Sequence, residues 1–319
     1  MVRFCQRWMI VALSGALLFN LGASIAQADG LDEISGAEYF DSNSVVIVSD
    51  AKRASEKPRL YMAVFTKNKT RYIPVPVSGW ETSGTRPDDL EAICDVPGEP
   101  GYYYAAESGF FQGQGGRIFR LHVFKDDDGE YRATSEGSFL PFPLAEPEYS
   151  TPSRLQIEGM EALAHPKTGE ILLLGLRGSA KHPGTLLWGQ LRDGKFIIAG
   201  HCSIDLRTVI QGRSISDLHL VENHGNYDVL SVATADPGDN GPFESAICLV
   251  GSFDPVKMMF TPCEPKVIHH LDGLKIEAVG STPEFIRNSH MFYGTDDEAF
   301  GGFIRPLRAH AKDPRNEQK

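Results

Sequence analysis

One pattern of residues recurs four times along the chain, and this repetition limits the possible folds more than any other feature. Each copy begins with a short apolar segment that carries an acidic residue, and a turn and a second apolar segment follow. The acidic residues of successive copies stand 70, 56 and 60 positions apart: Glu91, Glu161, Asp217 and Glu277. Self-similarity at a nearly fixed period indicates a repeat architecture in which each copy is one structural unit.

The segments of each copy have the length and composition of short strands. The first segments cover 89–93, 159–163, 215–219 and 275–279, and the second cover 101–107, 171–177, 228–234 and 290–296. A looser fifth copy combines 37–40 with 44–49. In one copy two further segments follow, 117–123 and 131–134, and the Asp-Gly turn between them is typical of a hairpin. We therefore expect four antiparallel strands in each copy.

Four-stranded antiparallel units repeated around an axis define a β-propeller, so the chain is predicted to be all-β with a single propeller over residues 29–307. Five blades are favoured, and six are possible if the proline-rich stretch 140–152 contains strands. The last blade lacks an outer strand, which residues 31–34 could supply to close the ring. A β-sandwich is the competing architecture, but it gives no reason for an acidic residue at the start of each copy.

The two ends of the chain have patterns that differ from the repeats. Arg3 and Arg7 precede an apolar run over 8–21, and the small residues that follow end at Ala28. This is the pattern of a secretory signal peptide, so residues 1–28 are predicted to be removed and the protein to be exported, either periplasmic or secreted. No membrane insertion is expected after cleavage. Residues 308–319 are predicted to be a polar, flexible tail.

The net charge is strongly negative, and this bears on possible partners. It is −11 for the whole chain and −13 without the two leader arginines. Nucleic acids and anionic lipids bind through Lys/Arg patches, so both are unexpected partners here, whereas cations are favoured.

Four cysteines follow the leader: Cys94, Cys202, Cys248 and Cys263. An even number in an oxidising compartment allows two disulfides in three connectivities, although four free thiols are equally compatible with the sequence. Cys248 with Cys263 is the best candidate pair, because these residues flank a predicted hairpin.

The repeated acidic residues are the first candidates for a site. In a propeller the first strand of each blade lines the central channel, so Glu91, Glu161, Asp217 and Glu277 are expected to converge there. Oxygen-only ligands favour calcium, or another divalent cation, over zinc. Alternatively, these carboxylates accept hydrogen bonds from the backbone of neighbouring blades, or pair with Arg86, Arg177 and Lys275.

Charged residues also follow the second strands, where loops at one end of the propeller would present them. Glu107, Arg177 and Asp296 are the candidate catalytic residues, and Asp236, Asp239, Asp297 and Glu298 accompany them. Arg177 could hold a carboxylate or phosphate in a bidentate manner beside a metal. A small anionic substrate is therefore one expected ligand.

Several of these motifs resemble a group of exported bacterial propellers: families of unknown function related to the esterase-like and phytase-like propellers. The motifs are 88–93, 157–163, 175–178, 275–277 and 296–298, with alanine after Glu91, Glu161 and Glu277 in place of the glycine usual in these families. The resemblance spans about residues 86–307. It implies an acid-lined channel, a calcium requirement and hydrolysis of a phosphoester or ester.

The sequence is therefore compatible with two functions. The first is a metal-assisted hydrolase of a small phosphoester or ester. The second is a non-catalytic binding or scaffold propeller for a partner protein or an envelope glycan. An exposed patch formed by Trp80, Phe110, Phe111 and Phe243 would favour the second, since large exposed apolar patches mark interaction sites.

Overall fold

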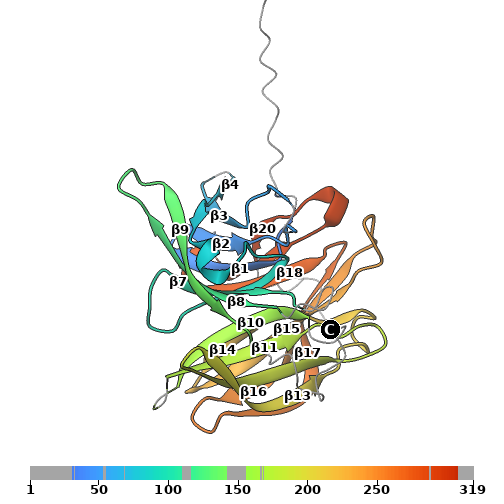
Figure 1. Ribbon diagram of the computed structural model, residues 1–319. Helices are drawn as coiled ribbons and strands as arrows, with labels where there is room; N and C mark the ends of the chain where they lie inside the picture. The colour runs from blue at the N-terminus through green and yellow to red at the C-terminus, as the bar shows by residue number, and fades with distance from the viewer. Residues whose placement is uncertain are drawn as a thin grey trace, which may run out of the picture.

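Five antiparallel sheets succeed one another along the chain of the computed structural model (Figure 1). The structure describes residues 31, 33–52, 55–67, 69–109, 116–141, 156–165, 167, 169–286 and 289–307, with the backbone alone at 283–286. The predicted leader and tail, and most of the stretch suspected of a sixth blade, lie outside these residues. In the part of the chain that is described, no helix is long and apolar enough to cross a membrane.

Each sheet is one blade, and its strands follow the chain from the inside outward. Blade 1 contains β1 (Gly36–Asp41), β2 (Ser44–Val48), β3 (Leu60–Phe65) and β4 (Thr70–Pro74). Blade 2 contains β6 (Leu90–Asp95), β7 (Tyr102–Glu107), β8 (Ile118–Lys125) and β9 (Tyr131–Phe139), with the two-residue β5 (Val77–Ser78) parallel to β9. Blade 3 contains β10 (Ile157–His165), β11 (Gly169–Leu176), β12 (Gly184–Arg192) and β13 (Lys195–Ile204).

The last two blades follow the same order. Blade 4 contains β14 (Arg213–Asn223), β15 (Asn226–Ala235), β16 (Glu244–Asp254) and β17 (Met259–Asp272). Blade 5 contains β18 (Ile276–Ile286), β19 (Ser289–Thr295) and β20 (Ile304–Pro306). Two short 3-10 helices, η1 (Trp80–Ser83) and η5 (Glu298–Phe300), lie in connections. The prediction of an all-β, five-bladed propeller with four-stranded antiparallel blades is confirmed, apart from the short fifth blade and the added β5.

The first strands of the blades form the inner ring of the propeller. β1 contacts β6, and the contacts continue from β6 to β10, β14 and β18 and back to β1. Every first strand therefore has two neighbours, and residues from all five can meet at the central channel.

The ring is closed by residues from both ends of the described chain. Blade 5 contributes only three strands of its own, and Leu31 pairs with Gly302 beside β20. The two backbone hydrogen bonds of this bridge measure 2.9 and 2.6 Å. Figure 1 shows the blue strands of blade 1 beside the red end of the chain. The N-terminal residues thus supply the closure expected from the sequence, as one bridge rather than a full strand.

The apolar core is divided among the interfaces between blades. Five clusters of buried side chains occur in the described residues, and each joins a pair of adjacent blades. Both faces of each blade are covered, which explains the continuous apolar runs of the second strands. Blades 3 and 4 approach closely at Gly159 of β10, where a Cβ atom would lie 2.5 Å from the backbone nitrogen of Leu218 in blade 4. Glycine is required there to let the two inner strands pack.

The expected disulfide between Cys248 and Cys263 is not formed, and all four described cysteines are free thiols. Cys248 is buried and lies opposite Val267 on β17, whereas Cys263 is exposed. One register shift, between Leu249 and Gly251, lies between the two cysteines, and the pairing of Gly251 with Pro262 nearer the turn already offsets Cys263 from Cys248. The hairpin was predicted, but the position of its turn over 255–258 and its bulges were not, and both decide which residues face each other.

Candidate functional site

Charged side chains line a cavity of about 250 Å³ at one end of the central channel. In blades 1, 2, 3 and 5 the residues come from two places, the beginning of the first strand and the loop that follows the second strand, whereas blade 4 contributes Arg213 alone. We call this cavity the channel mouth. Its lining residues are Ser35, Asp50, Lys52, Asp89, Glu91, Ser108, Gln156, Arg177, Arg213, Lys275, Glu277, Asp296 and Glu298.

A register shift at the start of three inner strands places a glutamate in the same position of each blade. The shifts lie between Leu90 and Ala92, between Ile157 and Gly159, and between Ile276 and Ala278. The residue inside each shift has no cross-strand partner, and such residues are often turned toward a site. These residues are Glu91, Glu158 and Glu277. Glu91 and Glu277 line the channel mouth, and Glu158 contacts two of its arginines.

Two buried cations hold the carboxylates of blades 3, 4 and 5. Arg213 contacts Glu277 at 2.9 Å, Asp236 at 2.5 Å and Glu158 at 3.4 Å. The Nζ atom of Lys275 lies 2.8 Å from Asp296 and 3.3 Å from Glu277. Burial alone would lower the pKa of both cations, but the surrounding carboxylates raise it above the usual value. Both side chains therefore remain charged at neutral pH.

The opposite wall of the mouth is acidic and has less positive charge. One carboxylate oxygen from each of Asp50, Asp89 and Glu91 lies within 4.8 Å of the others. Their nearest cation is Lys52, which bonds Asp89, lies 3.8 Å from Asp50 and has a side chain that is 60% exposed. Asp89 has a φ of 66°, a left-handed backbone that aspartate tolerates better than most residues.

Burial and neighbouring charge alter the acidity of this wall. Burial raises the pKa of Asp50 to about 7, and the adjacent Glu33 carboxylate contributes to the rise. The pKa of Glu91 lies well above its usual value because the side chain is buried near Glu158 and Asp89. Like charges at this separation favour either a shared proton or a bound cation.

Several buried polar atoms of the channel mouth have no hydrogen-bond partner. Five such side-chain atoms occur in the described part of the chain, and four belong to cavity-lining residues: Asp50 Oδ1, Arg213 Nε, Glu277 Oε2 and Asp296 Oδ1. Glu277 and Asp296 are only 3% and 7% exposed. Buried polar atoms nearly always find partners, so these four atoms are left to bond water or a ligand in the cavity.

Four of the seven candidate residues chosen from the sequence meet at this mouth. They are Glu91, Arg177, Glu277 and Asp296. Burial raises the pKa of Asp296 to about 6, against the opposing effect of Lys275. In the described structure Arg177 makes one ion pair, with Glu158 at 3.5 Å, and its side chain is 30% exposed. Among the cations that line the mouth, Arg177 therefore makes the fewest ion pairs with protein carboxylates.

Glu161 and Asp217 do not lie at the mouth, so the four repeated acids do not form one ring. Asp217 accepts hydrogen bonds from the backbone nitrogens of Leu218 at 2.8 Å and Val279 at 2.6 Å. Glu161 accepts one from the backbone of Leu220 at 3.2 Å. Each carboxylate thus bonds the next blade, as the alternative role for these acids anticipated.

Glu107 is also away from the cavity, and its contacts are structural. Its carboxylate accepts hydrogen bonds from the Arg117 guanidinium at 2.5 and 3.0 Å. It also accepts hydrogen bonds from the backbone N–H groups of Asp88 and Arg117, at 2.9 Å each. With 5% of its surface exposed and both oxygens occupied, it offers nothing to a substrate.

The sequence reasoning missed Asp50, Asp89 and Arg213. A positional signal for Asp50 was present, because it follows the second strand of blade 1 as Arg177 and Asp296 follow those of blades 3 and 5. Arg213 gave no such signal, since it stands before the register shift of its strand, whereas the glutamates of blades 2, 3 and 5 stand inside theirs.

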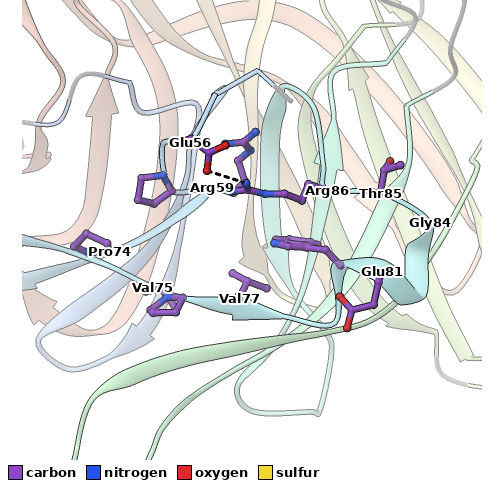
Figure 2. Close-up of a pocket in the computed structure, with 12 residues that line it drawn as sticks. Glu56, Arg59, Pro74, Val75, Val77, Glu81, Gly84, Thr85 and Arg86 are labelled. Carbon is purple, nitrogen blue, oxygen red and sulfur yellow. Dashed lines mark ion pairs between the residues drawn. The ribbon is translucent and has the colours of Figure 1, made fainter. Parts of the chain in front are cut away.

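Two other places in the described structure also gather charged side chains. A pocket where blades 1 and 2 meet is lined by Trp80, prolines and Arg59, and the Arg86–Glu56 pair crosses it at 3.6 Å (Figure 2). Arg59 is engaged by four backbone carbonyls. Trp80 and Phe243 are buried in the core, so they form no exposed aromatic patch, and Phe110 and Phe111 lie outside the described residues.

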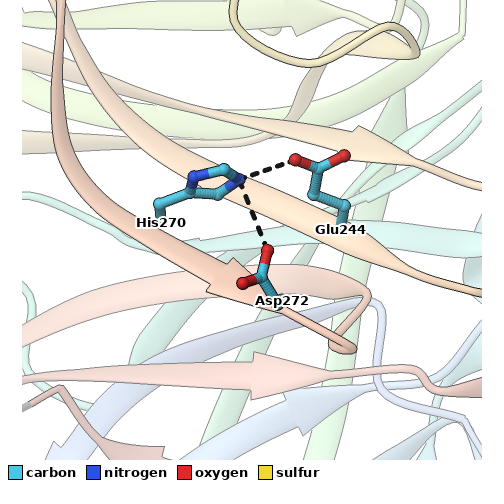
Figure 3. Close-up of side chains that lie close together, drawn as sticks. All are labelled: Glu244, His270 and Asp272. Carbon is cyan, nitrogen blue, oxygen red and sulfur yellow. Dashed lines mark hydrogen bonds and ion pairs between the residues drawn. The ribbon is translucent and has the colours of Figure 1, made fainter.

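The second place is a His-carboxylate group on the β16–β17 pair (Figure 3). His270 Nε2 lies 2.8 Å from Glu244 and 3.8 Å from Asp272. The side chains of His270 and Asp272 are 48% and 93% exposed, so nothing beyond the ion pairs organises this surface.

No protein-family model and no curated protein matches the sequence. Solved structures do share the fold. An exo-1,5-alpha-L-arabinanase from a bovine ruminal metagenomic library is similar with a TM-score of 0.53 and 11% identity, over 88% of this chain and 95% of that one. The Cellvibrio cellulosa alpha-L-arabinanase, complexed with arabinohexaose, has a TM-score of 0.51 and 9% identity over 88% and 91%. At these identities the likeness concerns the fold.

Proposed function

We propose that the channel mouth is the active site of a hydrolase for a small anionic ester, first of all a phosphoester, with a divalent cation as cofactor. One observation carries this proposal: an acidic wall and an arginine-bearing wall share one cavity, and buried oxygens of both walls lack partners. It retains the function implied by the resemblance to phytase-like propellers. We place the activity outside the cytoplasm, as the leader expected over residues 1–28 implies.

The acidic wall has the donors that a calcium ion requires. Asp50, Asp89 and Glu91 offer three carboxylates within 4.8 Å of one another, and oxygen ligands favour calcium or magnesium. Lys52 would have to leave, and its largely exposed side chain can turn into solvent. A bound cation would polarise an ester oxygen and lower the pKa of a bound water.

The facing residues supply binding and proton transfer. Arg177, with one distant ion pair, is free to hold the anionic oxygens of the substrate. Arg213 and Lys275 stay charged and keep the field of this wall positive. Asp296, with a pKa of about 6 and a free Oδ1, is suited to protonate the leaving oxygen near neutral pH.

Hydrolysis of a glycosidic bond is a second candidate. Such enzymes need a carboxylic acid that remains protonated near neutrality beside a carboxylate, and Asp50 among Asp89 and Glu91 offers this pairing. The similar arabinanases act on a sugar polymer, which adds support. This chemistry requires no cation at the carboxylates.

One experiment on the mature protein distinguishes the phosphoester hydrolase from the glycoside hydrolase. After EDTA treatment, thermal unfolding is followed with added calcium or magnesium, and hydrolysis of p-nitrophenyl phosphate and of arabino-oligosaccharides is measured with and without the ion. We expect a rise in melting temperature and phosphatase activity with one ion, both lost in Asp89→Asn and Glu91→Gln. Asp126→Asn, at an exposed turn, is the matched control.

An Arg177→Ala variant that keeps the cation-induced shift but loses phosphatase activity would support the assigned roles. Glycosidase activity that is insensitive to EDTA would favour the second candidate. No thermal shift and no hydrolysis would refute both, and would direct attention to the non-catalytic alternative, binding of a partner protein or glycan.

A further inference from the structure

Three side chains from successive inner strands form a hydrogen-bonded chain away from the channel mouth. Ser281 Oγ on β18 lies 2.9 Å from Nε2 of His219 on β14, and Nδ1 of this histidine lies 2.8 Å from Oε1 of Glu161 on β10. The residues are 58 and 62 positions apart, close to one blade period. None of them lines the mouth.

The carboxylate determines which nitrogen of His219 carries the proton. Glu161 Oε1 also accepts a hydrogen bond from the backbone N–H of Leu220 at 3.2 Å, and this bond fixes the position of the carboxylate. Nδ1 of a neutral His219 must then donate to Glu161, and Nε2 presents its lone pair to the Ser281 hydroxyl. This is the arrangement in which a histidine can remove the proton of a serine.

Exposure and position make this chain a separate site. Glu161 and His219 are 8% and 6% exposed, whereas Ser281 is half-buried. Ser281 stands four residues beyond Glu277 on the same strand, which corresponds to about 13 Å along the channel. The base and its carboxylate are thus shielded, and the hydroxyl is the member that solvent can reach.

The surrounding charges limit the substrates that this serine could meet. Glu38 on β1, Asp95 on β6 and Asp217 on β14 all interact electrostatically with Glu161. Burial raises the pKa of all three acids, that of Asp95 to about 6, so an anionic acyl group would meet acidic side chains rather than a cation. Small, uncharged carboxylic esters fit this environment better than the anionic substrates proposed for the mouth.

We infer that Ser281 is a nucleophile activated by His219 and Glu161, and that it forms a second hydrolytic centre for small uncharged esters. Ser281 Oγ attacks the carbonyl carbon and forms a C–O bond while its proton passes to His219 Nε2. The bond to the leaving alkoxide breaks, and that proton moves to the alcohol. Water, deprotonated by the same nitrogen, then cleaves the acyl-serine and restores the hydroxyl as the carboxylic acid leaves.

A fluorophosphonate probe tests the nucleophile directly, because serine Oγ displaces fluoride and retains the probe. The full mature protein is treated in EDTA, so that a cation-dependent reaction at the mouth cannot contribute, and the adduct is located by intact mass and peptide mapping. We expect one adduct, on Ser281. Ser281→Ala, which keeps the Glu161–His219 pair, should show none, and the exposed Ser203→Ala should label as the wild type does.

The activating residues are tested by the rate of labelling. His219→Gln should label about a hundredfold more slowly or worse, the scale of a lost general base. Glu161→Gln should lower the rate and shift its pH profile, which a purely structural role would not do. Absence of an adduct on the wild type, or equal labelling of a folded His219→Gln variant, would overturn the inference. Neither outcome bears on the proposed function of the mouth.

Discussion

The role of Glu107 as a structural residue can be tested by one substitution with a matched control. Glu107→Gln removes one charge from a pair whose side chains are 6% and 15% exposed, and it places an amide beside the Arg117 guanidinium. Breaking a buried pair by removing one partner costs about 3–5 kcal/mol, because the other charge stays buried without compensation. Glu99→Gln makes the same change in the same blade, where the Glu99 and Arg120 side chains are 46% and 28% exposed. Exposed pairs contribute about 0–1 kcal/mol.

Urea unfolding followed by circular dichroism measures both free energies. We expect Glu107→Gln to lose at least about 2 kcal/mol more than Glu99→Gln. Adding Arg117→Met to Glu107→Gln should recover part of the loss, since the unpaired charge is then removed as well. Equal destabilisation by the two single variants, or no recovery in the double variant, would refute the structural role and return Glu107 to the candidate catalytic residues.

Three further predictions follow from described contacts. The pKa of Asp296 in the folded protein is about 6, above its ordinary value of 3.8, so the folded protein binds more protons between these values and its stability falls as pH rises through this window. Asp296→Asn should therefore become more stable relative to the wild type from about pH 4 to 6. A difference in the free energy of urea unfolding that stays constant over this range would contradict the prediction. Asp217→Asn should lower the melting temperature equally with and without calcium, because the carboxylate bonds the Val279 backbone of the next blade; loss of a calcium-dependent shift would instead support its role as a ligand. A thiol reagent should find four reactive cysteines in the denatured mature protein without reductant, and fewer would show that disulfides form.

The sequence predicted the blades well because each blade is a local unit. Alternating segments, an Asp-Gly turn and a recurring acid all lie within about 60 residues, and strand pairs in the structure follow chain order in every blade. The inner strand of blade 2, for example, was expected over 89–93 and covers Leu90–Asp95.

The candidate site was only partly predictable, because its geometry depends on bulges. Aligning Glu161 with Glu91 and Glu277 matched their following alanines, but the register shift in blade 3 contains Glu158, three residues earlier. Sequence similarity between blades therefore identified the wrong glutamate. A bulge leaves no mark in a short apolar segment. The pairing of Cys248 with Cys263 failed because the position of the hairpin turn, which sets the register, was not visible in the sequence either.

The Ser281–His219–Glu161 chain was not visible from any one blade. Each residue is unremarkable in its own strand, and the chain exists only because three inner strands lie side by side. Its nearly regular spacing could have suggested the contact only after the blade period had been accepted.

The bridge between Leu31 and Gly302 has a consequence for the order in which the propeller folds. The two residues are 271 positions apart, so their pairing requires closing the longest loop among the described strand contacts. Loop-closure entropy opposes such contacts until the intervening blades have compacted the chain. Blades 1 to 4 and the three strands of blade 5 can form locally, but the Leu31–Gly302 bridge requires both ends, so ring closure is expected to be the late, rate-limiting step of folding.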